Sequence, residues 1–367
     1  MKINIDRSVL LRALTHANSV VEKRTTIPIL SNVMLHADSG RLTLTATDLD
    51  IQITEHVVAE VEQAGSTTVA SGTLTDIVRK LPDGSRVQIA VEGSQLIITA
   101  GRSRFKLNVL PVDDFPVIAS GDLPDQIDIT ASQLSEMIDD TRFAMSGDET
   151  RYYLNGIYFH VEDKMLKAVA TDGHRLALSA VAYEGQNVNG IIVPRKTVAE
   201  VRKLLSEVDG VLQVHLSNAK IRFDLGEVTL TSKLVDGTFP DYTRVIPKSN
   251  DKVMLTDVSS LKVAAERVSI VSSDKTRALT MNVRHTAVEL SVVSPENGTA
   301  TDEISAECQN ELRIGFNARY LQDILSQVST DQVEFHFGDE SSPVLIKQKE
   351  AANDDREKTF ILMPMRV

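Results

Sequence analysis

A unit that occurs three times constrains the fold of this sequence more than any other feature. Each copy has a short apolar run, then a residue suited to cap a helix, then a Ser-x-Leu triplet. The capping residues are Asp6, Thr130 and Asp257, which lie 124 and 127 residues apart. A fixed repeat of this kind indicates one structural module used three times. The copies are INIDRSVLLRAL at 3–14, IDITASQLSEMI at 127–138 and VMLTDVSSLKVA at 253–264.

Each copy predicts the same elements in the same order. Side chains such as Asp and Thr accept hydrogen bonds from the free N–H groups of a first helical turn, so they mark helix starts. Runs that alternate apolar and polar residues follow each helix and predict antiparallel hairpins. A second helix follows in each unit, at 73–81, 196–205 and 317–328. Proline-rich stretches at 111–124 and 239–251 mark the boundaries.

We therefore predict an α+β protein of three repeated domains, each with two helices packed on antiparallel sheets. The predicted domains cover residues 1–118, 119–247 and 248–367. A chain of 367 residues is too long for one ordinary core, which agrees with this division.

Composition excludes several classes of protein. The single cysteine, Cys308, rules out an internal disulfide and predicts a small packed side chain. The N-terminus lacks the zones of a signal peptide and no run approaches 18 apolar residues, so we expect a cytoplasmic protein. No group of histidines or carboxylates has metal-ligand spacing, and we expect neither a metal nor a cofactor.

Charge is distributed unevenly along the chain. The net charge is −12, which taken alone argues against a polyanionic partner. The six predicted helical windows nevertheless sum to +5, so the remainder carries −17. Lysine and arginine also serve simply as helix formers on solvated faces, and this alternative stays open. An acidic exterior together with basic helices is compatible with binding a polyanion inside.

Geometry favours the polyanion interpretation. If three units form an arc and a second chain completes it, twelve helices line the hole. At about 10 Å between helix axes, the bore has a radius of about 13 to 14 Å. A DNA duplex of radius about 10 Å fits this bore with a layer of water. Loose phosphate contacts of this kind position a protein without reading sequence.

The stretch KAVATDGHRLALSAV at 167–181 has three possible interpretations. Asp172 and Gly173 inside an alternating run predict a hairpin turn, but a turn does not require the His174-Arg175 pair that follows. The pair could belong to a hydrolase site with Asp172 and His174, to a binding rim, or to a plain turn. The first unit has Thr-Asp at the equivalent strand but lacks Gly-His-Arg. The added residues are therefore candidates for function.

Five longer motifs resemble a known family. The chain is similar to the bacterial β sliding clamps, the processivity subunits of the DNA polymerase III holoenzyme, from residue 1 to residue 367. The resemblance implies half of a six-domain ring, a homodimer that encircles duplex DNA without sequence preference, tethers polymerases, is opened by an ATP-driven loader and catalyses nothing. The motifs are RYYLNG (151–156), ATDGHRLA (170–177), TSKLVDGTFPDY (231–242), GFNARYL (315–321) and MPMR (363–366).

The resemblance implies two sets of site residues. One set forms a pocket for linear motifs near QLxLF, carried by DNA polymerase subunits, the clamp loader and repair proteins: Leu154, Thr171, Gly173, His174, Arg175, Leu176, Pro240, Val245, Tyr320, Pro343, Met363, Pro364, Met365 and Arg366. The other set contacts DNA: Arg24, Tyr152 and Tyr153, to which the basic helices add Arg79, Lys80, Arg195, Lys196, Arg202 and Lys203.

The two ends of the chain are predicted to form the contact between subunits. A basic, apolar edge strand at the end of the first unit faces acidic and apolar residues of the third unit in a head-to-tail pair. The alternative is an edge buried within one chain. The predicted interface residues are Arg102, Arg104, Phe105, Leu107, Ile270, Val271, Glu303 and Glu307. Three functional hypotheses remain: a DNA-encircling clamp, a hydrolase, and a scaffold that shares only the repeat.

Overall fold

The computed structural model describes residues 1–22, 26–119, 121–273, 277–349 and 356–366. The chain divides into two compact units. Unit 1 combines Met1–Ser132 with Ala199–Leu234, and unit 2 combines Gln133–Val198 with Val235–Val367. Two helices, α3 (Ala131–Thr141) and α4 (Arg195–Leu204), have residues in both units.

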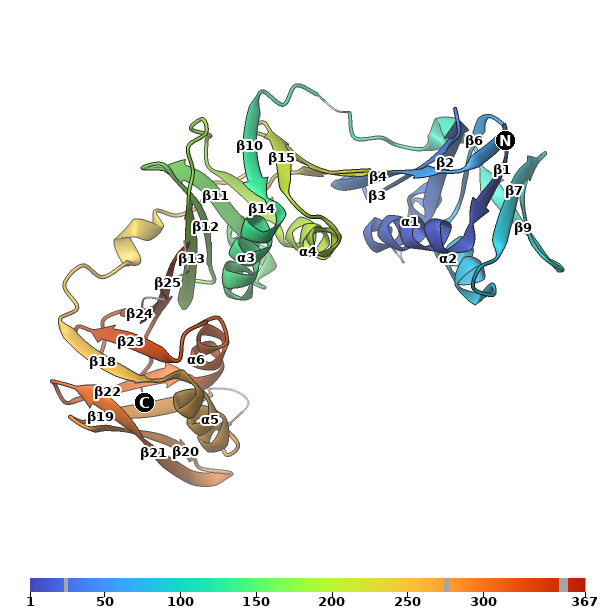
Figure 1. The fold of residues 1–367 in the computed structure, drawn as a ribbon. Helices are drawn as coiled ribbons and strands as arrows, with labels where there is room; N and C mark the ends of the chain where they lie inside the picture. The colour runs from blue at the N-terminus through green and yellow to red at the C-terminus, as the bar shows by residue number, and fades with distance from the viewer. Residues whose placement is uncertain (23–25, 120, 274–276, 350–355, 367) are drawn as a thin grey trace. The chain divides into compact units, whose positions relative to one another are not determined.

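Unit 1 is built on one antiparallel sheet with the order β10-β15-β16-β17-β4-β3-β2-β6-β9-β8-β7-β1-β5. Its helices α1 (Arg7–Val20) and α2 (Ser71–Lys80) pack against each other and lie together over the sheet (Figure 1). The strands are β1 (Lys2–Asp6), β2 (Asn32–Asp38), β3 (Arg41–Thr47), β4 (Ile51–Val58), β5 (Glu60–Gln63), β6 (Gly65–Ala70), β7 (Arg86–Glu92), β8 (Gln95–Ala100), β9 (Ser103–Leu110), β10 (Asp125–Thr130), β15 (Val211–Leu216), β16 (Lys220–Leu225) and β17 (Val228–Lys233). Short 3-10 turns are η1 (Pro28–Ser31), η2 (Val112–Asp114) and η5 (Leu205–Glu207).

Unit 2 is built on a second antiparallel sheet with the order β14-β11-β12-β13-β25-β24-β23-β18-β21-β20-β19-β22. Helices α5 (Val258–Ser269) and α6 (Ala318–Leu325) pack side by side on it (Figure 1). The strands are β11 (Gly156–Glu162), β12 (Met165–Thr171), β13 (Arg175–Ala182), β14 (Ile191–Pro194), β18 (Lys252–Asp257), β19 (Ala278–Val283), β20 (Ala287–Ser294), β21 (Gly298–Cys308), β22 (Leu312–Asn317), β23 (Gln332–Phe337), β24 (Val344–Gln348) and β25 (Arg356–Leu362). Short 3-10 turns are η3 (Arg142–Ala144), η4 (Glu149–Leu154) and η6 (Tyr242–Val245).

The repeated helix starts follow from local chemistry. The Asp6 side chain accepts a hydrogen bond from the Ser8 N–H at the start of α1, and Asp257 does the same for Ser260 at the start of α5. Each helix then buries one stripe of apolar residues at spacings of three and four. In α1 the buried residues are Leu10, Ala13, Leu14, Ala17 and Val20.

The predicted α+β architecture is confirmed, and two predicted helices are too long. The first helical window of the charge sum covers residues 6–24, but α1 ends at Val20 because Val21 has an extended backbone (φ −61°, ψ 133°). The helix predicted at 317–328 ends at Leu325, and turn residues follow it. Strand pairing also joins neighbouring repeats: β17 pairs with β4, and β13 pairs with β25. Cys308 is buried, as expected, and its thiol donates to the Asn310 carbonyl at 3.0 Å.

No helix among the described residues is long and apolar enough to cross a membrane.

Candidate partner-binding and DNA-binding sites

The stretch that raised the functional question is a turn built around the Asp172 side chain. Its Oδ1 accepts hydrogen bonds from the N–H groups of His174 (2.9 Å) and Arg175 (3.0 Å). The Thr171 hydroxyl donates to the Arg175 carbonyl at 2.6 Å and accepts from the Gly173 N–H at 3.1 Å. Gly173 has φ +87°, a value that favours glycine. Asp172 is therefore a turn-forming side chain of the Asx type.

Arg175 anchors this turn to the rest of unit 2. The residue is 9% exposed, and its guanidinium pairs with Asp172 (3.2 Å) and Asp323 (2.5 Å). It also donates to the Phe143 carbonyl at 2.7 Å and lies 4.4 Å from the centroid of the Tyr320 ring. A planar guanidinium that donates through all three of its nitrogens holds its partners in a defined geometry. Arg175 thus supports the wall of the site.

Two of the predicted pocket residues, the exposed His174 and the half-buried Tyr320, lie beside each other. Their rings are 6.2 Å apart at an interplanar angle of 21°. Next to them, Leu154 and Leu176 belong to one apolar cluster that also contains the buried Tyr242. Burial raises the pKa of Tyr242 to about 12, so its hydroxyl stays neutral and shares a hydrogen bond of 2.9 Å with the His160 ring.

Other predicted pocket residues are placed less deeply. Val245 is exposed at the end of η6, and Pro240 is exposed just before it. Pro343 is half-buried, and its carbonyl accepts a hydrogen bond from the Asn250 side chain at 2.9 Å.

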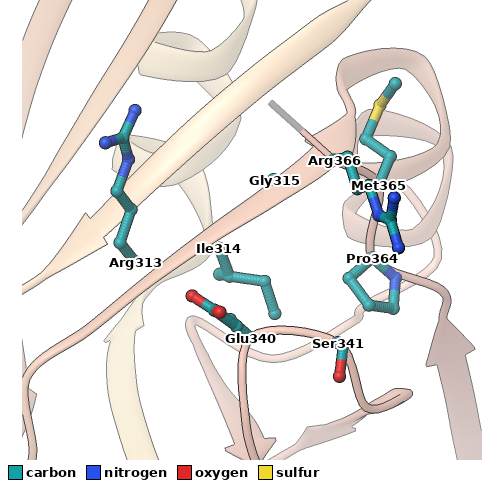
Figure 2. Close-up of a pocket in the computed structure, with 8 residues that line it drawn as sticks. All are labelled: Arg313, Ile314, Gly315, Glu340, Ser341, Pro364, Met365 and Arg366. Atoms are coloured by element: carbon teal, nitrogen blue, oxygen red, sulfur yellow. The ribbon is translucent and has the colours of Figure 1, made fainter.

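The C-terminal segment lies beside the turn. The Met363 N–H donates to the His174 carbonyl at 2.9 Å, and the Met365 N–H donates to the Gly315 carbonyl at 2.9 Å. The segment therefore runs from the turn to strand β22. Beside β22 it lines a cavity of about 650 Å³ (Figure 2). The residues that line this cavity are Arg313, Ile314, Gly315, Glu340, Ser341, Pro364, Met365 and Arg366.

The predicted DNA-contacting tyrosines lie on η4. Tyr152 is 54% exposed, and Tyr153 is half-buried. Arg195 holds the base of this loop, because its guanidinium donates to the Asn155 side chain (2.8 Å) and to the carbonyls of Met145 (2.9 Å) and Ser146 (2.6 Å). Burial lowers the pKa of Arg195. Arg195 is predicted to contact phosphate, and the structure adds a second role, because its hydrogen bonds position this loop.

The remaining basic residues lie on the helices from which they were predicted. Arg79 and Lys80 are exposed in the last turn of α2, where Arg79 pairs with Asp76 at 2.8 Å. Lys203 is exposed on α4 and pairs with Glu200 at 2.7 Å. On the same helix, Lys196 is exposed and Arg202 is half-buried. Arg24 lies outside the described residues.

The predicted interface residues lie on two strands and a helix end. Strand β9 pairs with β8 over Ser103–Asn108, whereas the register with β6 covers only Val109 and Leu110. Arg102 and Arg104 are exposed, and Phe105 and Leu107 are half-buried on the alternate face.

The third repeat holds the other predicted interface residues. Strand β21 pairs with β20 over Gly298–Ser305 but with β18 only over Ala306–Cys308. Glu303 and Glu307 are exposed on β21, and Glu303 lies 3.4 Å from Arg284. Ile270 is 81% exposed after α5, and Val271 is half-buried.

Comparison with known proteins places the whole chain in one family. Models of the DNA polymerase III beta subunit match it in three consecutive parts: the N-terminal domain over 1–119, the central domain over 128–241 and the C-terminal domain over 243–366. The chain belongs to the DNA polymerase III beta subunit family. Beta sliding clamps of Caulobacter vibrioides and Pseudomonas aeruginosa are 45% and 40% identical to it, each over 100% of both chains.

Solved beta sliding clamps have the same fold. The clamp of Bartonella birtlesii, solved bound to griselimycin, is 44% identical, with a TM-score of 0.96 and 100% of both chains covered. A Pseudomonas aeruginosa clamp is 39% identical, with a TM-score of 0.95 and the same coverage. As a beta sliding clamp, the chain is a non-catalytic processivity subunit of DNA polymerase III. The hydrolase and the unrelated-scaffold hypotheses are therefore wrong.

Sequence reasoning missed several residues of these sites. Asp323 lies three positions after Tyr320 on α6, so helical spacing placed both on one face and could have identified it as a partner of Arg175. Phe143 contributes a backbone carbonyl, which carries no sequence signal. Arg313 and Glu340 line the cavity of Figure 2 but belong to none of the motifs.

Proposed function

We propose that two copies of this chain close head to tail into a ring around duplex DNA and hold polymerases on it through the pocket beside the C-terminal segment. The match of family models to nearly the whole chain is the observation that carries this proposal. Each chain contributes three domains, at 1–118, 119–247 and 248–367, and works in the cytoplasm at the nucleoid.

Ring closure uses the open edges of β9 and β21. Unpaired strand edges invite pairing with another chain, and two different edges on one chain generate a closed head-to-tail assembly when the rotation fits. Charge supports this partnership, because Arg104 on β9 and Arg102 in the turn before it are basic, whereas β21 presents Glu303 and Glu307. Opposite charges across the contact favour this pairing over contacts of like edges.

DNA binding uses the basic side chains of α2 and α4 together with Arg24 and the tyrosines of η4. Exposed lysines and arginines such as Lys80 and Lys196 neutralise phosphates without reading bases. Arg195 contributes by holding the loop that carries Tyr152 and Tyr153.

Partner binding uses the apolar surface between the turn at 171–176 and residues 363–366. Leucines of a QLxLF-type motif would be buried against Leu154 and Leu176, beside the ring pair of His174 and Tyr320. The flexible side chains of Met363 and Met365 suit a site that accepts several partners. Solved relatives bound to griselimycin support a ligand site in this family.

Retention on DNA tests the ring. The clamp is loaded by its ATP-driven loader onto nicked circular DNA, and the same DNA is then cut once. We expect the protein to stay on the circle through gel filtration and to leave the linear form within minutes. Equal loss from the two forms would contradict topological linkage and with it the proposed function.

A further inference from the structure

The cavity of Figure 2 extends beyond the proposed peptide pocket. Pro364, Met365 and Arg366 line this cavity and also belong to the pocket prediction. The other walls come from β22, with Arg313 and Ile314, and from the loop between β23 and β24. A volume of about 650 Å³ is within the range of about 300 to 1,000 Å³ that is typical of ligand pockets.

The walls of this cavity are held in place by internal hydrogen bonds. The bond from the Met365 N–H to the Gly315 carbonyl fixes the C-terminal segment beside β22. In the loop, the Asp339 carboxylate accepts from the Ser341 N–H (2.8 Å), the Ser341 hydroxyl (2.9 Å) and the Ser342 N–H (2.7 Å). These hydrogen bonds lower the pKa of Asp339 to about 2. The cavity is thus formed before any ligand arrives.

Charged groups in this cavity are available to a ligand. Arg313 and Arg366 are exposed, and Figure 2 shows them on opposite sides of the cavity. Neither guanidinium has an ion-pair partner within the described part of the chain, nor has the exposed carboxylate of Glu340. Other arginines of the same unit are paired, such as Arg267 with Asp302 and Arg284 with Glu289.

The net balance of these groups is positive in a chain whose net charge is −12. Two guanidiniums next to a single carboxylate complement an anionic ligand, and arginine recognises carboxylates in a bidentate way. The half-buried side chains of Pro364 and Met365 supply apolar contact area on the Arg366 side of the cavity, while Ile314 is buried in its floor. A short extended peptide with acidic side chains matches this combination of apolar floor and cationic sides.

We propose that this cavity binds acidic residues that flank the hydrophobic motif of partner proteins, with Arg313 as the residue that selects them. The inference rests on the proposed function, because Pro364, Met365 and Arg366 would hold the motif and its flank at once. Partners would then share an apolar core motif and differ in affinity according to the charge beside it.

Fluorescence anisotropy with labelled peptides tests this inference. All peptides contain one QLxLF-type core, extended by four residues that are Asp and Glu, Gly and Ser, or Lys, at either the N-terminal or the C-terminal side. At low salt we expect the acidic extension on one side to bind about 3- to 10-fold tighter than the Gly and Ser extension, the size expected for one or two exposed ion pairs. The gain should disappear in 1 M salt because exposed charges are then screened.

Variants assign the gain to Arg313. Arg313→Ala should remove the preference for the acidic extension and leave affinity for the Gly and Ser peptide unchanged. Arg313→Glu should reverse the preference in favour of the Lys extension. Arg319→Ala is the matched control, because Arg319 is also an exposed arginine of the third repeat but lies on α6 outside this cavity. It should leave every affinity as in the wild type.

The outcomes separate this inference from the proposed function. If no peptide with the QLxLF-type core binds the wild-type protein, the peptide pocket of the proposed function is wrong. If the core binds but all three extensions give equal affinity on both sides, only the inference about the cavity is wrong. A single-stranded oligothymidine that displaces the acidic peptide, in a way that Arg313→Ala abolishes, would reassign the cavity to nucleic acid and overturn the inference.

Discussion

At the residue scale, His16 shows how one side chain joins distant parts of unit 1. Its Nδ1 lies 2.8 Å from a Glu55 carboxylate oxygen on β4, and its Nε2 lies 3.1 Å from Glu207 on η5. A ring that faces carboxylates through both nitrogens donates to both only when it is protonated. Arg12 adds a further positive charge 3.8 Å from Glu55, which is 2% exposed.

The protonation of His16 makes a prediction about pH. Burial by itself would lower the pKa of His16, but its hydrogen bonds and charge interactions with Glu55 and Glu207 outweigh burial and raise it. Because the folded-state pKa exceeds the unfolded value near 6.5, this stabilisation is complete below about pH 6.5 and is lost as the pH rises through the raised pKa.

His16→Gln should therefore destabilise the protein by about 1.5 to 3 kcal/mol at pH 6 and by less at pH 9. Urea unfolding across this pH range measures the difference. His36→Gln is the control, since His36 is exposed and contacts the Ser66 hydroxyl at 2.7 Å. A His16→Gln effect that stays constant with pH would show that protonation of the ring contributes nothing.

At the element scale, a buried ion cluster joins helix α3 to strand β25. Asp140 accepts from Lys358 (3.0 Å), Arg356 (3.0 Å) and the Ser179 hydroxyl (2.9 Å). Burial raises the pKa of Asp140 although the two cations oppose that shift. The Lys358 side chain is only 4% exposed, so its charge depends on this carboxylate. The cluster thus aligns the third repeat with the second within unit 2.

Removing the charge of Asp140 alone should destabilise the protein more than removing the charges of Asp140 and Lys358 together. Asp140→Asn leaves the Lys358 ammonium buried without its anion, and we expect a loss of about 3 to 5 kcal/mol. Combining it with Lys358→Met should recover a large part of that loss, as a double-mutant cycle in urea would measure.

An exposed pair supplies the comparison. Arg86→Met breaks its ion pair with Glu60, and both partners are more than half exposed, so the cost should stay below about 1 kcal/mol. If Asp140→Asn cost no more than Arg86→Met, the buried cluster would not stabilise unit 2.

Sequence reasoning found the elements whose cause is local. The caps Asp6 and Asp257 and the alternating strands could be predicted, because each signal lies within a few residues of the structure it produces. The pairing of β13 with β25 could not be predicted from local signals, since Ser179 and Lys358 are joined only by the fold. The predicted pocket residues at 171–176 and 363–366 came from the family motifs that contain them. Arg313 lies outside every motif, so only the fold shows that it lines the cavity beside residues 364–366.

At the scale of the whole molecule, the distribution of charge suits a protein that surrounds DNA. The net charge of −12 keeps the chain from binding polyanions indiscriminately, while the helical windows carry +5. Binding then requires that DNA meets the helices rather than the remaining surface. A closed ring enforces that condition, which makes the contact between subunits the decisive element of the proposed function.

The subunit contact makes the last prediction. Ile270 is 81% exposed in the isolated chain, so a second subunit could bury nearly all of this aliphatic side chain. We expect Ile270→Ala combined with Val271→Ala to remove enough buried apolar area that light scattering reports the 40.3 kDa chain mass in place of twice that value. Val58→Ala, at an equally exposed valine of β4, should leave the dimer intact.

The same variant separates ring closure from partner binding. The proposed pocket is formed by residues of one chain, so the double variant should bind a QLxLF-type peptide with wild-type affinity. It should nevertheless leave circular DNA as fast as linear DNA, because a monomer has no closed path around the duplex. A variant that keeps the dimer mass would show that the contact does not involve Ile270 and Val271. Peptide binding lost together with the dimer would contradict a pocket contained within one chain.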